Sequence, residues 1–189
     1  MEEVQTARKI RLRLAGIPGE ILPPFLGSDT VMILSGKKPG PNITLRADID
    51  ALELDDFSGV PWASRVKGLS HSCGHDGNTA ILMGTALVLS ELQEFLNGTV
   101  RFIFQPGEEG FGGGRLLVEK GVLEMEPIPA AVYALHGWPG QPLNTLSAGS
   151  GPAMAACDRF AVNIYGKGGH GARPNLAVDP ILTGSAVVQ

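Results

Sequence analysis

The sequence predicts an α/β fold built on a largely parallel sheet. Strand-like and helix-like segments alternate over residues 42–135 in the order strand, helix, strand, helix, strand, and this order is typical of parallel strands joined by crossover helices. Polar motifs follow the expected ends of three strands, with the sequences RADID, QPGEE and HGWP. Since sites in open α/β sheets collect at the carboxyl ends of the strands, the three motifs indicate one shared site.

The N-terminal part of this pattern holds one helix and two strands. Residues 2–15 are expected to form a helix that ends at Gly16. Two short apolar runs predict strands, TVMILS at 30–35 and NITLRADI at 42–49. The segment KKPGP at 37–41 lies between them and predicts a turn, because it combines proline with glycine.

A loop, a long helix and a third strand follow. Residues 52–69 have no clean period and are expected to form a loop. Residues 78–96 form a long segment whose first half is apolar almost all round, which predicts a buried helix. Asp76 or Asn78 is expected to cap it. The run TVRFIFQ at 99–105 predicts the next strand.

The remaining segments complete the first domain and begin another. Residues 113–120 predict a helix stopped by Gly121, and AAVYAL at 130–135 predicts a strand. In residues 158–166 apolar and polar side chains alternate, which predicts an antiparallel strand with one face in water. A helix is expected to start at 179–189.

These elements predict two domains of unequal completeness. Residues 1–150 are expected to hold the α/β domain with the shared site. Residues 151–189 would begin a second domain, and one strand with the start of a helix is too little for a core of its own. The chain is therefore expected to be part of a longer polypeptide.

Composition and charge exclude several classes of protein. The chain has 189 residues and 43% hydrophobic side chains, enough to bury a core, and its net charge of −4 argues against a nucleic-acid partner. It has no apolar run of about 18 residues, so no membrane span is expected. The charged N-terminus does not resemble a signal peptide. Two cysteines do not make a disulfide framework, and a reducing, cytoplasmic location is expected.

The motif HSCGHDG at 71–77 places a thiol, Cys73, two residues from an imidazole, His75. The whole chain has only 2 Cys and 4 His, so this crowding is unusual. A buried structural cysteine is the plain alternative. A thiol nucleophile with histidine as its base is another, although the neighbouring carboxylates disfavour the thiolate. Metal ligation is the preferred interpretation, because thiolate and imidazole are zinc-type ligands.

Two further motifs supply carboxylates and a second imidazole. Glu108 and Glu109 follow an apolar strand within PGEEGFGGG, where one side chain can bind a metal while the other faces water as a general base. The alternative is a solvated acidic turn. His136 follows the strand at 130–135 and is a candidate ligand, although a lone histidine there is more often structural.

Three other residues have less certain chemistry in the sequence. Asp48 and Asp50 end a strand, where they can either orient a ligand imidazole or form a turn in which Arg46 pairs with one of them. His170 lies in the run GKGGHG, which lacks the spacing of a phosphate loop. It is either a turn histidine or a donor to a substrate oxygen.

With these motifs together, the chain resembles the metal-dependent amidohydrolases of the aminoacylase and hippurate hydrolase family, which includes the auxin-conjugate hydrolases. The resemblance covers most of the chain after residue 40, and the combination of motifs is specific. They are LRADIDAL (45–52), HSCGHDGNTAILMGTA (71–86), FIFQPGEEGFGGGRLLVEKGVL (102–123), ALHGWP (134–139) and the segment at 147–181.

The resemblance implies a pair of divalent metal ions, zinc or manganese first, with cobalt or nickel as alternatives. It implies ligand roles for Cys73, His75, Glu109 and His136, and a base role for Glu108. Asp50 matches a supporting aspartate, and His170 matches a histidine of a lid domain that contacts substrate. The resemblance also implies that residues 1–150 are the N-terminal part of the catalytic domain and that residues 151–189 begin an inserted α+β lid, through which a homodimer would form. The implied reaction is hydrolysis of N-acyl amino acids or similar small amides by metal-activated water.

Departures from the family pattern leave an alternative open. This chain has Asn78 and Asn175 where family members usually have histidine, which affects the expected substrate fit more than metal binding. The family's last histidine ligand and an N-terminal HxxPE-like stretch are not found in these residues. The alternative is a truncated, inactive homologue with residual metal binding or a role in assembly.

Overall fold

The fold is that of a computed structural model, which describes residues 2–156, 158 and 160–189. The chain divides into two compact units, Met1–Gln141 and Pro142–Gln189. The assignment of a catalytic domain to residues 1–150 and of a lid domain to residues 151–189 stays a prediction.

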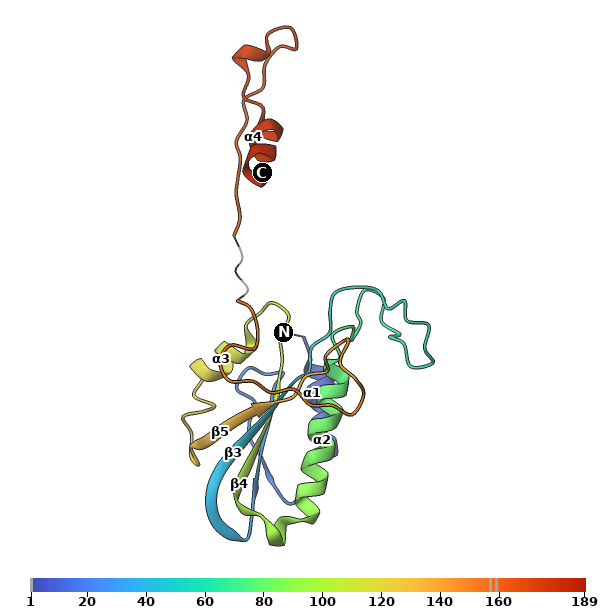
Figure 1. The fold of residues 1–189 in the computed structure, drawn as a ribbon, viewed down its shortest axis with the longest axis vertical. Helices are drawn as coiled ribbons and strands as arrows, with labels where there is room; N and C mark the ends of the chain where they lie inside the picture. The colour runs from blue at the N-terminus through green and yellow to red at the C-terminus, as the bar shows by residue number, and fades with distance from the viewer. Residues whose placement is uncertain (1, 157, 159) are drawn as a thin grey trace. The chain divides into compact units, whose positions relative to one another are not determined.

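The first unit is built on a five-stranded sheet with the order β1-β2-β4-β3-β5 (Figure 1). The strand β3 pairs in parallel with both β4 and β5, while β2 is antiparallel to β4 and to β1. Only β2 therefore runs against the other four, and the expected α/β fold is confirmed. The strands are β1 Glu20–Ile21, β2 Thr30–Ser35, β3 Lys38–Asp48, β4 Asn97–Gln105 and β5 Pro129–Ala134.

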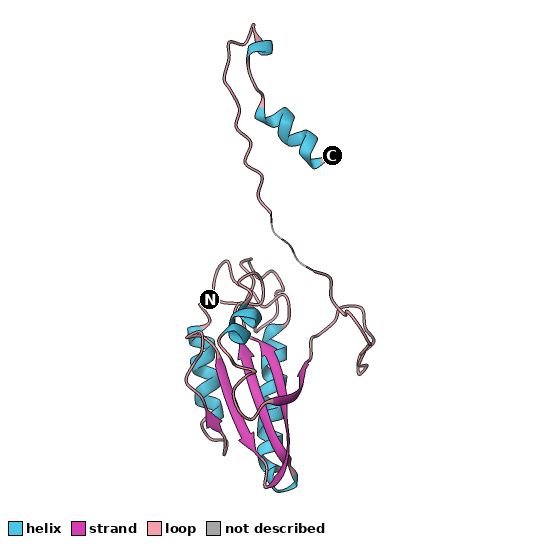
Figure 2. Cartoon of the chain, turned by 90° about the vertical axis from the view of Figure 1, so that its left-hand side faces the viewer, coloured by secondary structure: helices cyan, strands magenta, loops and turns pink. Residues whose placement is uncertain are grey.

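Helices cover both faces of this sheet (Figure 2). Side chains alternate in direction along a strand, so Phe102 and Phe104 of β4 join a core with α1 and α2, whereas Ile103 packs on the α3 side. Both phenylalanines are fully buried. The helices are α1 Val4–Leu14, α2 His75–Glu91 and α3 Gly113–Glu119, with a 3-10 turn η1 at Gln93–Phe95. No helix in the described ranges is long and apolar enough to cross a membrane.

The turn predicted at 37–41 is wrong, because β3 already begins at Lys38. Lys38 pairs with Asn97, and the register shifts between Lys38 and Asn42. This irregular start depends on glycine. A Cβ at Gly40 would lie 2.7 Å from the Gly98 nitrogen, and one at Gly98 would lie 2.0 Å from the Pro41 oxygen. The two backbones approach so closely that the breaker residues extend the strand.

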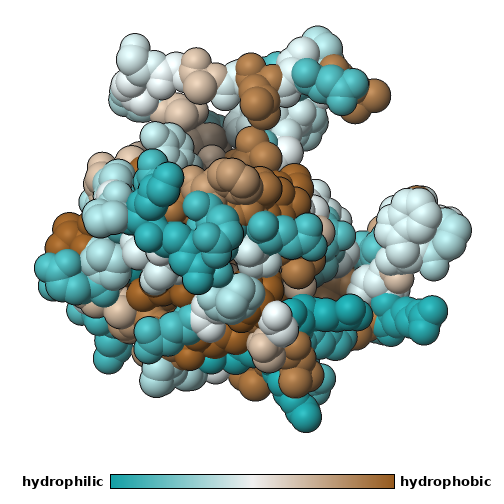
Figure 3. Space-filling view, turned by 90° about the horizontal axis from the view of Figure 1, so that it is seen from below, coloured by the Kyte–Doolittle hydropathy of each residue, from teal (hydrophilic) through white to brown (hydrophobic). Residues whose placement is uncertain are grey.

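The helix α2 differs from its prediction in bounds, cap and burial. It begins three residues earlier than expected, at His75, because Gly74 takes φ 83° at the N-cap position. No side chain caps it, and Asp76 only accepts a hydrogen bond from the neighbouring Gly77 nitrogen. The expected burial is confirmed for one face of the helix only, since Val88 is 58% exposed. Apolar side chains also reach the surface seen in Figure 3.

The second unit is small and mostly exposed. It contains a 3-10 turn η2, Pro174–Leu176, and α4, Pro180–Val188, whose first turn is capped by Asp179 through hydrogen bonds to its carboxylate. The strand predicted at 158–166 is not formed at 160–166, and residue 159 lies outside the described residues. A strand needs a hydrogen-bonded neighbour, and among the described residues of this unit the one isolated bridge joins Lys167 and Val178.

A buried arginine fastens the chain between α3 and β5 to the sheet. Arg101 of β4 is fully buried and donates to three carbonyl oxygens, those of Val122 at 2.6 Å, Met125 at 2.9 Å and Pro127 at 2.9 Å. Burial lowers the pKa of its guanidinium. The side chain therefore satisfies the backbone of a segment that has little regular structure of its own.

We expect Arg101→Met to lower the free energy of unfolding by about 2–3 kcal/mol, because three carbonyls lose donors that carry a charge. Urea unfolding followed by circular dichroism measures it. The control is Arg115→Met, an exposed arginine paired with Glu119 on α3, which should change stability by less than about 0.5 kcal/mol. Equal effects of the two substitutions would contradict the structural role of Arg101.

Candidate metal centre

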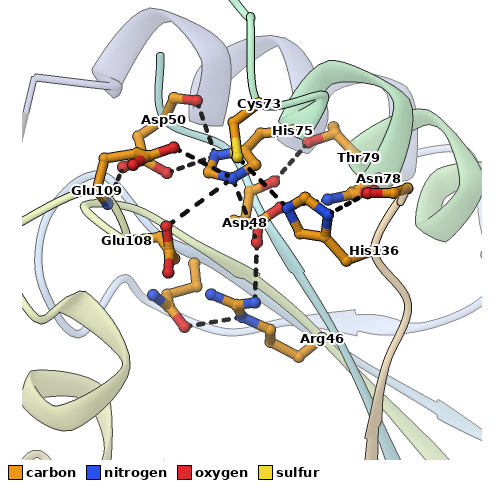
Figure 4. A network of polar contacts seen from close by, with 12 residues as sticks. Arg46, Asp48, Asp50, Cys73, His75, Asn78, Thr79, Glu108, Glu109 and His136 are labelled. Carbon is orange, nitrogen blue, oxygen red and sulfur yellow. Dashed lines mark hydrogen bonds and ion pairs between the residues drawn. The ribbon is translucent and has the colours of Figure 1, made fainter. Parts of the chain in front are cut away.

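The candidate site lies where the chain leaves the carboxyl ends of three parallel strands (Figure 4). Asp50 follows β3, Glu108 and Glu109 follow β4, and His136 follows β5. The N-terminus of α2 brings His75 to the same place. Since parallel strands end at one edge of the sheet, segments far apart in sequence converge there.

Asp50 holds the His75 ring and the glutamate loop in fixed relation. Its carboxylate Oδ1 lies 3.0 Å from His75 Nδ1, and its carbonyl oxygen lies 3.1 Å from the same nitrogen. Because both partners are acceptors, Nδ1 is the donor and Nε2 keeps a free lone pair. The other carboxylate oxygen accepts from the Glu109 backbone nitrogen at 2.9 Å. One buried aspartate thus orients an imidazole in the way that metal-binding histidines are usually oriented.

The Nε2 atom of His75 is buried and has no hydrogen-bond partner, and the same is true of Glu109 Oε1. The two atoms are 3.8 Å apart, and Glu108 Oε2 lies 3.9 Å from the same nitrogen. Buried polar atoms without partners are rare and call for an explanation such as an ion. A cation bound by both His75 Nε2 and Glu109 Oε1 would give each of these atoms a partner. His75, Glu108 and Glu109 therefore form one group whose donor atoms fit a metal.

A second group shares His75 and adds a thiol and another imidazole, from Cys73 and His136. The Cys73 sulfur lies 3.6 Å from His136 Nε2. The other ring nitrogen of His136 donates to the Gly137 carbonyl at 2.7 Å, which directs Nε2 toward the sulfur. Thiolate, imidazole and carboxylate together are a donor set suited to zinc and related divalent ions.

The chemistry of Cys73 favours a ligand over a nucleophile. Burial, followed by the hydrogen bond and charge of Glu109 and the charges of Glu108 and Asp48, raises the pKa of the Cys73 thiol to about 11. A nucleophilic cysteine needs a lowered pKa. A cation at the same place would stabilise the thiolate. The carboxylates that surround Cys73 therefore oppose the thiol-nucleophile interpretation.

Below these groups lies a buried polar network, of which the sequence indicated only that Arg46 pairs with Asp48 or Asp50. Asp48 is 1% exposed and accepts hydrogen bonds from Arg46 at 2.9 Å and from Asn78 at 2.8 Å. Arg46 also donates to Gln105 at 2.8 Å. The available signal was the alternation of strand β3, which places Arg46 and Asp48 on the same face. Asn78 is buried and its amide is bonded to Asp48, and the effect of its departure on substrate fit stays a prediction.

His170 belongs to the second unit. It lies in an exposed turn, where its Nδ1 accepts from the Ala172 nitrogen at 3.2 Å and its carbonyl accepts from Arg173 at 2.8 Å. The hydrogen bond at Nδ1 leaves Nε2 as a donor toward solvent. Asn175 lies in the same exposed region. A substrate contact by His170 stays a prediction.

Comparison with known families gives one match over most of the chain. Residues 44–188 match the model of peptidase family M20/M25/M40. The matched segment contains every residue of the candidate metal centre as well as the turn with His170.

Comparisons with individual proteins agree with this match. The chain is 43% identical to an N-acetylcysteine deacetylase of Bacillus subtilis over 99% of its own length and 49% of the relative. It is 39% identical to an IAA-amino acid hydrolase of Arabidopsis thaliana, ILR1-like 4, over 99% of this chain and 42% of that one. The chain thus spans about half the length of these curated relatives.

A solved structure is also similar. It is a dinuclear metal-binding peptidase of the M20 family from Bacillus subtilis, with a TM-score of 0.70 and 43% sequence identity. The similarity covers 74% of this chain and 38% of that protein.

Proposed function

Since the chain belongs to peptidase family M20/M25/M40, we propose that it contributes the metal centre of an amidohydrolase. The proposed reaction is hydrolysis of the amide bond of N-acyl amino acids or similar small amides. The observation that carries this proposal is the pair of buried, unpartnered atoms, His75 Nε2 and Glu109 Oε1, within a cluster of ligand-type side chains. Relatives named for N-acetylcysteine and for IAA-amino acids support the substrate class.

The residues present fit a metal, and we assign Cys73, His75, Glu109 and His136 as its ligands. His75 belongs to both donor groups, which is compatible with two divalent ions close together. The similar solved structure is named as dinuclear. Zinc or manganese is the first choice and cobalt or nickel the second, because thiolate favours zinc while imidazole and carboxylate accept all four. Bound divalent ions polarise an amide carbonyl and make water more acidic.

Glu108 is the proposed general base, and its position relative to Glu109 supports the distinction. The Glu109 backbone is held by Asp50, and its Oε1 atom is buried. The Glu108 side chain is 43% exposed, against 27% for Glu109. A carboxylate at the open side of the cluster can accept a proton from the attacking water and return it to the leaving nitrogen. Asp50 keeps His75 in the orientation that this arrangement requires.

Further assignments belong to the same proposal. Residues 1–150 would form the catalytic domain and 151–189 would begin the lid, in which His170 donates to a substrate oxygen. A homodimer through the lid is proposed on the family resemblance. No nucleic acid or membrane is a proposed partner, and the cytoplasm is the proposed location.

The proposal is tested by incubating the metal-free chain with Zn²⁺ or Mn²⁺ and an N-acyl amino acid such as N-acetylcysteine or hippurate. Release of the free amino group is measured with an amine-reactive dye. We expect metal-dependent release that a chelator abolishes, because the bound ion would polarise the amide carbonyl. Tight metal binding without turnover would favour the alternative, a homologue with only metal binding or an assembly role. Absence of metal binding would contradict the proposed function itself.

A further inference from the structure

A third carboxylate lies near the metal-facing nitrogen of His75. Asp48 Oδ2 is 3.7 Å from His75 Nε2, closer than either glutamate. Both of its oxygens already have partners, since Oδ2 is bonded to Arg46 Nη1 at 2.9 Å and Oδ1 to Asn78 Nδ2 at 2.8 Å. Asp48 therefore differs from Glu109, whose buried oxygen has no partner. These bonds indicate that Asp48 supports the site through hydrogen bonds and is not itself a metal ligand.

The charge of Asp48 is balanced inside the fold. The side chain is 2% exposed, and a buried carboxylate is tolerated when it is paired and hydrogen-bonded. Arg46 supplies the opposite charge, and it is fixed in turn by its bond to Gln105 at the end of β4. The pair thus joins the ends of two neighbouring strands at the level of the candidate site.

The same aspartate fastens the first turn of α2 to the end of β3. Asn78 binds its carboxylate, and the Thr79 hydroxyl donates to its main-chain oxygen at 2.9 Å. Two successive helix residues bound to one strand residue define the position of the helix start. His75 is the first residue of that helix, and Cys73 immediately precedes its N-cap. Any rotation or shift of α2 would therefore move two proposed ligands together.

We propose that Asp48, bound by Arg46 and Asn78, is a positioning residue of the metal centre. By docking α2 on β3 it sets where Cys73 and His75 lie relative to Glu109 and His136. This inference rests on the proposed metal site and adds to it. Asp50 fixes the rotation of the His75 ring, while Asp48 fixes the helix that carries the ring.

The test compares metal affinity in matched variants of the whole chain. Asp48→Asn keeps the shape and removes the charge, while Asn78→Ala removes only the bond to α2. Asp76→Asn is the control, because Asp76 is an exposed carboxylate beside His75 whose hydrogen bond in the described part of the chain is from the Gly77 nitrogen. Zn²⁺ affinity is measured by competition with a chromophoric chelator. Co²⁺ loading reports the Cys73 contact through its thiolate charge-transfer absorption, and thermal unfolding of the metal-free chain reports the fold.

We expect Asp48→Asn to weaken Zn²⁺ binding by about 10–100-fold, as loss of an outer partner typically does. Asn78→Ala should weaken it by roughly 10-fold, and the double variant by less than the product, because both act through one bond. Both should alter the Co²⁺ absorption, and the control should change neither readout. If Asp48→Asn does not fold, Asn78→Ala decides the question.

Unchanged affinity and an unchanged Co²⁺ spectrum in the folded variants would overturn the inference, even if thermal stability fell. That result would mean that the network supports the fold alone. Failure of the unaltered chain to bind metal is a different outcome, which overturns the proposed function and this inference with it.

Discussion

Glu108→Gln is expected to lower turnover of an N-acyl amino acid by about 10²–10⁴-fold, the usual contribution of a general acid–base group. Glutamine keeps the shape of the side chain but cannot accept the proton of the attacking water. Metal affinity should stay almost unchanged, because the proposed ligand among the two glutamates is Glu109. Steady-state kinetics under metal saturation and chelator competition measure the two quantities.

The neighbouring substitution Glu109→Gln provides the sharpest comparison. It should weaken metal binding strongly, since Glu109 Oε1 is the buried atom left without a partner. Glu119→Gln is the matched control, because it removes an exposed carboxylate on α3 whose partner is Arg115. Turnover is measured in a form of the protein that hydrolyses the substrate before any substitution is made. Normal turnover by Glu108→Gln would refute the base assignment. Loss of metal in that variant would mean that Glu108 is the ligand and Glu109 the base.

Strand positions were predictable from the sequence because they depend on local patterns. The run at 30–35 matches β2, Thr30–Ser35, residue for residue, and the strand expected at 130–135 differs from β5, Pro129–Ala134, by one residue at each end. Apolar runs of this length have few alternatives within an α/β pattern. The convergence of motifs at strand ends followed from the parallel direction of β3, β4 and β5, which the alternation of strands and helices had indicated.

The errors arose where tertiary contacts override local signals. Proline and glycine at 37–41 predicted a turn, but the close approach of Gly98 allows a strand there. The helix predicted from residue 78 starts at His75, because Gly74 adopts a left-handed conformation that no periodicity reports. The alternation at 158–166 predicts a strand only if a neighbour exists to pair with it, and spacing within one segment carries no information about a neighbour.

The same limit explains the missed part of the site. Asn78 meets Asp48 across 30 positions of the sequence, and Gln105 meets Arg46 across 59. The motif residues were recognised because thiols and imidazoles are rare and chemically specific. The sequence indicated a pair between Arg46 and one of the two aspartates, and the pair with Asp48 is confirmed. Asparagine and glutamine are common, so only the fold shows that Asn78 and Gln105 join this pair in one buried network.

Cys73→Ser is expected to weaken metal binding by more than about 100-fold, beyond the 10–100-fold typical of an outer partner. A serine hydroxyl keeps its proton, whereas the Cys73 thiol, with its pKa raised to about 11 by burial and the neighbouring glutamates, can lose its proton to a bound cation. The comparison is made in a Cys157→Ser background, so that Cys73 is the only thiol. Chelator competition gives the affinity, and Co²⁺ charge-transfer absorption should disappear.

His71→Ala is the control for this experiment, because His71 is an exposed imidazole two residues from Cys73 and belongs to neither donor group in the described residues. Its affinity for metal should equal that of the parent chain. Equal metal content in Cys73→Ser and the parent would remove the thiol from the site. The rival nucleophile mechanism predicts a trapped acyl-enzyme at Cys73 and turnover that a chelator does not affect. Since burial and then the surrounding carboxylates raise the pKa of the Cys73 thiol, a cation is the partner that makes this cysteine compatible with its surroundings.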